Sequence, residues 1–95
     1  METLDQLSDF ISRVASDDRL KPTHISLYVA LCHAWITSRF QQCYNVSRRQ
    51  LMRLSRIQSN STYHKAISEL VDMGYITYRP SYHPKEGSEV TLLIG

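Results

Sequence analysis

The chain has 95 residues, of which 42% are hydrophobic, and a net charge of +2. This size suffices for one small domain with one core, so we predict a single domain over residues 1–95. The apolar run from Ile25 to Ile36 is broken by polar residues and is shorter than the ~20 residues of a membrane span. The first residues lack the pattern of a signal peptide. We therefore expect a cytoplasmic protein that does not contact a membrane.

The charge is distributed unevenly along the chain. Residues 19–68 contain no Asp or Glu and sum to +8, whereas residues 1–18 sum to −4 and residues 69–95 to −2. A domain that concentrates positive charge in one segment is typical of a surface that meets polyphosphate, although a solvated basic surface has the same pattern. The distribution of charge favours a nucleic acid as the partner.

The first predicted element is an amphipathic helix within residues 1–18, which starts at Thr3 or Asp5 and ends near Ser16. Polar positions, including Arg13, are predicted to stay outside. The apolar stripe of this helix has to be buried either on its own domain or against a second copy, so a homodimer through the N-terminal helix is one of two alternatives. The stripe consists of Leu4, Leu7, Phe10, Ile11 and Val14.

A second helix is predicted to begin just after Pro22, since proline is favoured in the first turn of a helix. Its apolar face is broad, which makes it the central helix of the core. Cys32 and Trp35 are predicted to be core residues. A short strand-like piece follows at residues 43–46. The apolar face of the helix comprises Ile25, Leu27, Tyr28, Leu31, Cys32 and Trp35.

Two short helices with serine caps are predicted next. Ser47 caps a helix over residues 48–55, and Ser59 caps a helix that ends at Gly74, where a left-handed residue is needed. Ile57 anchors the turn between them. The inward residues are Leu51, Met52 and Leu54 in the first of these helices and Tyr63, Ala66, Ile67, Leu70 and Val71 in the second.

The C-terminal part is predicted to be a β-hairpin. Residues 75–79 and 89–94 are strand-like, and the segment 80–88, with two prolines and a glycine, forms a long loop between them. The complete order is helix, helix, short strand, helix, helix, strand, loop and strand. This order predicts a mainly α fold with a small β-hairpin, in the α+β class.

The capped helix, the turn, the Ser- and Thr-rich helix and the Gly-aromatic-Ile ending resemble the winged helix-turn-helix family of bacterial regulators and of phage or plasmid replication proteins. The resemblance covers residues 22–94 and depends on Ser47–Ile57, Ser61–Leu70 and Gly74–Ile76. It implies a winged-helix core over residues 22–94, with the hairpin as the wing and the N-terminal helix as an addition. Arg56 stands in the turn where members of this family often have glycine, so we expect it to adopt an uncommon backbone conformation. It also implies binding of double-stranded DNA by a small transcriptional regulator or mobile-element accessory factor, without a cofactor.

The side chains of this region support DNA binding independently. The arginines of the first capped helix belong to the element that crosses the DNA backbone, and we assign Arg48, Arg49, Arg53 and Arg56 to phosphate groups. Short polar side chains and free backbone amides at the start of the next helix suit bases and phosphates, and Asn60 can pair with adenine. The candidate base-reading residues are Ser59, Asn60, Ser61, Thr62, His64 and Lys65, and the candidate wing residues are Tyr82, His83 and Lys85.

Catalytic and metal sites are not predicted. The four histidines are scattered, and Cys32 and Cys43 lack the spacing of zinc ligands. The sequence contains no paired carboxylates and no Gly-rich phosphate loop, and no nucleophile stands with a recognisable base, so we do not expect an enzyme. The alternative interpretation is a winged helix that docks another protein in a replication or mobilisation complex. The acid-free segment argues against it, since a protein-docking surface has little reason to exclude Asp and Glu.

Overall fold

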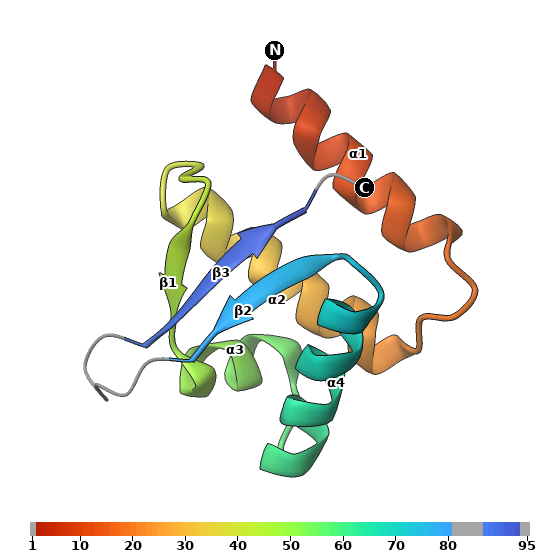
Figure 1. The fold of residues 1–95 in the computed structure, drawn as a ribbon, viewed down its shortest axis with the longest axis vertical. Coiled ribbons are helices and arrows are strands. Elements are labelled where there is room, and N and C mark those ends of the chain that lie inside the picture. Colours follow the sequence, from red (N-terminus) through yellow and green to blue (C-terminus); the bar gives the residue numbers. More distant parts are fainter. Residues whose placement is uncertain (1, 81–86, 94–95) are drawn as a thin grey trace.

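The computed structural model describes residues 2–80 and 87–93. In this part of the chain, helices and a small sheet follow one another in the predicted order, so the α+β class is confirmed (Figure 1). No helix among these residues is long and apolar enough to cross a membrane. The elements are α1 (Glu2–Ser16), α2 (Pro22–Thr37), β1 (Tyr44–Val46), α3 (Arg48–Ser55), α4 (Asn60–Asp72), β2 (Ile76–Arg79) and β3 (Ser88–Leu92).

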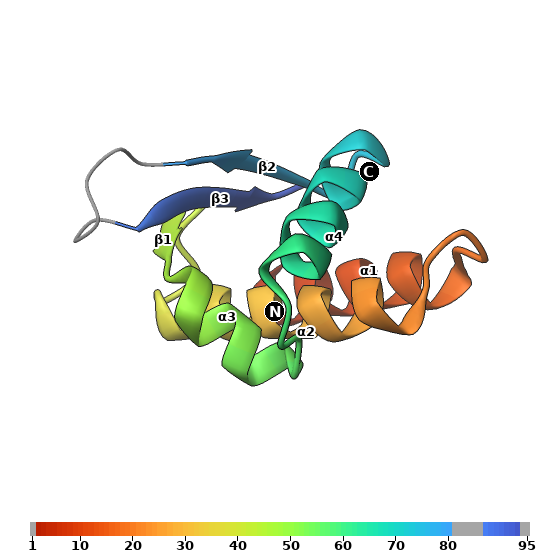
Figure 2. The same cartoon turned by 90° about the horizontal axis from the view of Figure 1, so that it is seen from below.

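The strands form one antiparallel sheet in the order β1-β3-β2. Val90 of the central strand lies opposite Tyr44 of β1 and Tyr78 of β2, and it is fully buried. β2 and β3 therefore form the predicted hairpin, and β1 adds a third strand to its other edge. The sheet lies on one side of the molecule and α1 and α2 lie on the other (Figure 2).

Helix α2 is the centre of the core, as predicted. It contacts α3, α4 and β1, and its Leu27 and Leu31 are fully buried. Helix α1 is attached to it through Phe10, whose ring makes edge contacts with Tyr28 and Trp35 at centroid distances of 6.4 Å and 5.4 Å. Such aromatic contacts supply much of the buried area of a small domain. They join the N-terminal helix to the remainder of the fold.

Local sequence signals placed the starts of α3 and α4 correctly and the start of α2 to within one residue. The Ser47 hydroxyl accepts a hydrogen bond from the N–H of Gln50, and the Ser59 hydroxyl accepts one from the N–H of Thr62, both at 3.3 Å. Pro22 is the first residue of α2. Gly74, just beyond α4, has a φ of 81°, in the left-handed region that favours glycine. These predictions succeeded because each depends on groups a few residues apart.

The predicted apolar faces are partly wrong. In α1, Phe10 and Val14 are buried, but Leu4 is 64% exposed and Ile11 is 53% exposed. The reason is that α1 touches the domain along a narrow line instead of burying its whole apolar stripe. The helix also begins at Glu2, ahead of either predicted start. Three further residues that were predicted to be buried are exposed: Ile25, Leu54 and Val71.

Candidate nucleic-acid interface

Helix α3 presents a row of arginines to solvent. Leu51, which is buried, lies opposite Arg49 and Arg53 on the helix, and α3 packs on α2. The hydroxyl of Ser26 in α2 donates a hydrogen bond to the carbonyl of Ser55 at the end of α3. The helix is thus held at both ends, by this bond and by its serine cap, while its outer face stays open. The exposed cations of that face are Arg48, Arg49 and Arg53.

The turn from α3 to α4 depends on a left-handed Arg56, which has a φ of 65°. This conformation is uncommon for a residue with a side chain, and it is the one expected from the sequence. The N–H of Ile57 donates to the carbonyl of Met52 at 3.0 Å, and the Ile57 side chain is only 7% exposed. The buried isoleucine therefore anchors the turn, and the Arg56 side chain remains exposed.

The predicted base-reading residues occupy the cap and first two turns of α4, and all of them are exposed. Ser59 is partly engaged, because its hydroxyl caps the helix and also lies 2.8 Å from the hydroxyl of Ser61. The ring of His64 makes an edge contact with the buried ring of Tyr63 at a centroid distance of 5.3 Å. This contact restricts the imidazole, while Asn60 stands at the first position of the helix.

The cations of this surface have no acidic partner within the described ranges. The carboxylates there that lie beside a basic side chain are Asp17, which forms an ion pair with Arg19, and Glu69, which lies beside the ring of His24. Neither α3 nor α4 has an acidic residue in its first turn. The charges of the surface are therefore not neutralised by those parts of the protein, and the positive ends of two helix dipoles add to them. The unpaired cations are Arg48, Arg49, Arg53, Arg56 and Lys65.

A shallow hollow of about 240 Å³ lies at the start of α3. Arg49 and Arg53 line it together with Ser47 and Gln50. Two guanidinium groups beside the free amides of a helix N-terminus suit an anion, and guanidinium matches phosphate oxygens in particular. Phosphate is thus the ligand chemistry that this hollow fits.

The two sets of candidate residues lie at the same end of the molecule. Figure 1 shows α3 and the start of α4 together at the bottom of the view, far from α1 at the top. We call this surface, formed by Arg48, Arg49, Arg53, Arg56 and residues 59–65 except the buried Tyr63, the reading face. The predicted wing residues Tyr82, His83 and Lys85 lie outside the described residues.

Sequence reasoning missed a buried pair that connects α2 to α4. His24 is 3% exposed, its Nδ1 accepts the N–H of Lys21 at 2.9 Å, and its Nε2 lies 3.2 Å from a carboxylate oxygen of Glu69. Since Nδ1 is an acceptor, the neutral ring carries its proton on Nε2 and donates it to Glu69. Residues 19–68 contain no Asp or Glu, so the sequence next to His24 offers no such partner. The partner is 45 residues away in sequence, so local patterns could not reveal it.

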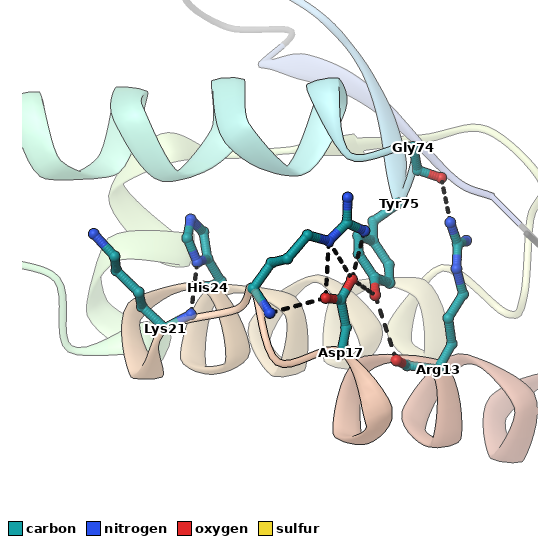
Figure 3. A network of polar contacts seen from close by, with 7 residues as sticks. Arg13, Asp17, Lys21, His24, Gly74 and Tyr75 are labelled. Carbon is teal, nitrogen blue, oxygen red and sulfur yellow. Dashed lines mark hydrogen bonds and ion pairs between the residues drawn. The ribbon is translucent and has the colours of Figure 1, made fainter.

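A second polar network joins α1 to the start of β2 (Figure 3). Arg13, which was predicted to stay outside, donates to the carbonyls of Gly74 and Leu93, each at 3.1 Å, and its guanidinium lies 4.2 Å from the ring centroid of Tyr75. Asp17 accepts hydrogen bonds from Arg19 at 2.6 Å and from the Tyr75 hydroxyl at 2.7 Å. Those bonds from Arg19 and Tyr75 hold the pKa of the Asp17 carboxyl well below its usual range.

The described residues contain no group of three or more His, Cys, Asp and Glu that could hold a metal ion. Cys32 is buried, and burial raises the pKa of its thiol to about 12, so it stays protonated at neutral pH. Cys43 is exposed and its sulfur lies 3.7 Å from a carboxylate oxygen of Glu89. Neither cysteine has the electropositive surroundings of a reactive thiol.

Comparisons of the chain with protein-family models, with curated proteins and with solved structures find no match. The assignment of a function therefore depends on the geometry and charge of the reading face.

Proposed function

We propose that this protein binds double-stranded DNA through a winged helix-turn-helix, in which α3 and α4 are the helix pair and the β2–β3 hairpin is the wing. The order of the elements supports this interpretation: a helix, a short strand, two helices joined by a tight turn, and a hairpin whose second strand pairs with the short one. The observation that carries the proposal is the set of exposed cations without acidic partners on the reading face.

In this proposal the start of α4 enters the major groove and α3 crosses the phosphate backbone. Asn60 and His64 contact base edges, and Arg48, Arg49 and Arg53 contact phosphates. The protein acts without catalysis, as a small transcriptional regulator or as an accessory factor of a mobile element. Its specificity then resides in a few residues of α4, and its affinity resides mainly in α3.

The test measures binding of a labelled mixed-sequence duplex between about 50 and 200 mM salt. Each phosphate contact contributes about −0.9 to the slope of log affinity against log salt. Arg49→Ala is expected to weaken binding to all sequences and to reduce the slope by about one contact. The matched control is Arg19→Ala, which removes an exposed arginine whose charge is already paired with Asp17.

Affinity that does not change with salt, or equal effects of Arg49→Ala and Arg19→Ala, would contradict phosphate binding by the reading face. Absence of binding to any duplex would instead favour the alternative in which this surface docks another protein.

A further inference from the structure

A cavity of about 450 Å³ opens at the surface away from the reading face. It lies between α1, the C-terminal end of α2, the connection from α2 to β1, and β3. Figure 1 shows α1 and the C-terminal end of β3 far from the start of α4. The volume falls within the range of about 300–1,000 Å³ that is usual for small-molecule sites. The cavity is therefore large enough for a ligand and is separate from the proposed DNA-binding surface.

Aromatic rings form one wall of this cavity. The ring of Trp35 makes edge contacts with the rings of Phe10 and Phe40, at centroid distances of 5.4 Å and 5.0 Å and interplanar angles of 75° and 81°. Phe10 and Trp35 are buried, at 4% and 5% exposure, whereas Phe40 is 45% exposed. The wall thus consists of two fixed inner rings with an accessible ring beside them. A planar aromatic ligand can add further edge or stacked contacts to this arrangement.

The backbone of Phe40 adopts an uncommon conformation. At the end of α2, the N–H of Arg39 donates to the carbonyl of Ile36 at 3.0 Å, and the N–H of Phe40 donates to that of Trp35 at the same distance. This pattern ends a helix with one left-handed residue, which here is Arg39, with a φ of 64°. Phe40 also has a φ of 64°, which the helix ending does not require and which is rare for a bulky residue. Such conformations persist where the surrounding structure holds them, and they concentrate at ligand sites.

Three other side chains that line the cavity are polar but uncharged. Gln6 of α1, Gln42 just before β1 and Thr91 of β3 border it with amide and hydroxyl groups, which both donate and accept hydrogen bonds. The described residues that line the cavity include no charged side chain. A charged ligand would lose hydration without gaining an ion pair, and a purely aliphatic one would leave the amides without a partner. The ligand that fits is a neutral, planar aromatic molecule with a hydrogen-bonding group at its edge.

We propose that this cavity is a binding site for a small neutral aromatic molecule that carries a carboxamide or a similar polar group. The ring of the ligand packs against Phe40 and Trp35, and its polar edge hydrogen-bonds to Gln6 or Gln42. This inference goes beyond the proposed function and does not depend on it, because the cavity and the reading face share no residue.

The single tryptophan of the chain makes binding directly measurable. Trp35 gives one indole N–H signal in a proton–nitrogen correlation spectrum, and this residue lines the cavity. Naphthalene carboxamide is expected to shift the signal with half-saturation below about 1 mM and to raise the melting temperature of the full chain. Decalin carboxamide, which has the amide without an aromatic ring, should bind about tenfold more weakly. Naphthalene carboxylate, which has the ring with a charge, should also bind more weakly.

Phe40→Gly removes the accessible ring together with the uncommon conformation, since glycine adopts positive φ values freely. We expect this variant to remain folded without ligand and to bind naphthalene carboxamide about tenfold more weakly. The matched control is Arg39→Gly, the same change at the neighbouring left-handed residue, whose side chain does not line the cavity. It should bind like the wild type. Gln42→Met keeps the length of the side chain without its amide and should also weaken binding.

A Trp35 signal that does not move with naphthalene carboxamide, or equal affinities for the three compounds, would overturn the proposal. A Phe40→Gly or Gln42→Met protein that binds as tightly as the wild type would overturn it as well. The three compounds are compared on the wild type, so this comparison decides the proposal even where a variant fails to fold.

Discussion

The arginines at the junction of α1 and β2 differ from those of α3 in whether their guanidinium groups meet hydrogen-bond acceptors of the protein. Arg13 donates to two backbone carbonyls and lies over the ring of Tyr75, and Arg19 is paired with Asp17. Arg49 and Arg53 are exposed and have no carboxylate partner in the described part of the chain. The guanidinium groups of Arg13 and Arg19 hydrogen-bond to acceptors of the protein. Those of Arg49 and Arg53 have no acidic partner there and are free to bind a ligand.

This difference gives a practical criterion for a basic protein. A cation whose N–H groups are hydrogen-bonded within the protein contributes to stability, so its removal should lower the free energy of unfolding. A cation without acceptors in the protein contributes little to stability, so its removal should instead weaken the affinity for the ligand. The two regions can therefore be separated by measuring both quantities on the same variants.

The largest effect is expected from replacing Arg48, Arg49 and Arg53 together by Ala. Loss of three phosphate contacts reduces the salt slope by about 2.7 and weakens binding at about 0.1 M salt on the order of a hundredfold. The free energy of unfolding should change by less than about 0.5 kcal/mol, as for ordinary surface positions. Anisotropy titrations and denaturant melts measure the two quantities. A large loss of stability with unchanged binding would reverse the roles assigned to the two regions.

Asn60→Ala and His64→Ala sharpen the comparison within the reading face. Each should cost roughly 1 to 3 kcal/mol on the preferred site and relax the preference at particular base pairs, because a base contact is lost. The salt slope should stay unchanged, in contrast to the arginine variants. Selection from a random duplex pool measures the sequence preference of both variants. Preferences identical to that of the wild type would mean that residues other than Asn60 and His64 contact the bases.

Arg13→Ala should act on stability alone. It leaves the carbonyls of Gly74 and Leu93 without their donor and removes the contact with the Tyr75 ring, which together should cost about 2 kcal/mol of unfolding free energy. DNA affinity measured well below the melting temperature should not change. Arg49→Ala is the control, as an arginine without protein acceptors. Equal stability of the two variants would mean that the junction does not depend on Arg13.

The smallest effect concerns the pH dependence of stability. The pKa of Asp17 is lowered in the folded protein from its usual value of about 3.9, first by Arg19 and then by the Tyr75 hydroxyl. A lowered folded pKa stabilises the fold at pH values above the unfolded pKa, and this contribution is lost as the pH falls from about 4 towards the folded value. Asp17→Asn should therefore be less stable than the wild type near neutral pH. The difference should shrink below about pH 4 in melts, and a constant difference would contradict the assignment.

Much of the fold followed from local signals. Ser47 and Ser59 start their helices, and Arg56 adopts a left-handed conformation, as the sequence predicted. The outward direction of Arg49 and Arg53 followed from the position of Leu51 on the opposite side of the same short helix. In each case the determining groups lie within a few residues of one another.

The faces of α1 show where such reasoning stops. Periodicity predicted one buried stripe, yet Phe10 and Val14 are buried while Leu4 and Ile11 are exposed. Periodicity identifies an apolar side of a helix, but the width that becomes buried depends on the shape and position of the neighbouring helix. The same limit applies to Leu54 and Val71, which lie at the margins of predicted inward faces.

The sequence by itself determined the order of the elements, the starts of α3 and α4 and the segment in which positive charge is concentrated, because these depend on neighbouring residues and on composition. Only the tertiary structure decided which charges are satisfied. Arg13 meets Gly74 across 61 residues and His24 meets Glu69 across 45. A side chain that is polar in the sequence becomes structural or available to a ligand according to which distant acceptors the folded chain brings within hydrogen-bonding distance.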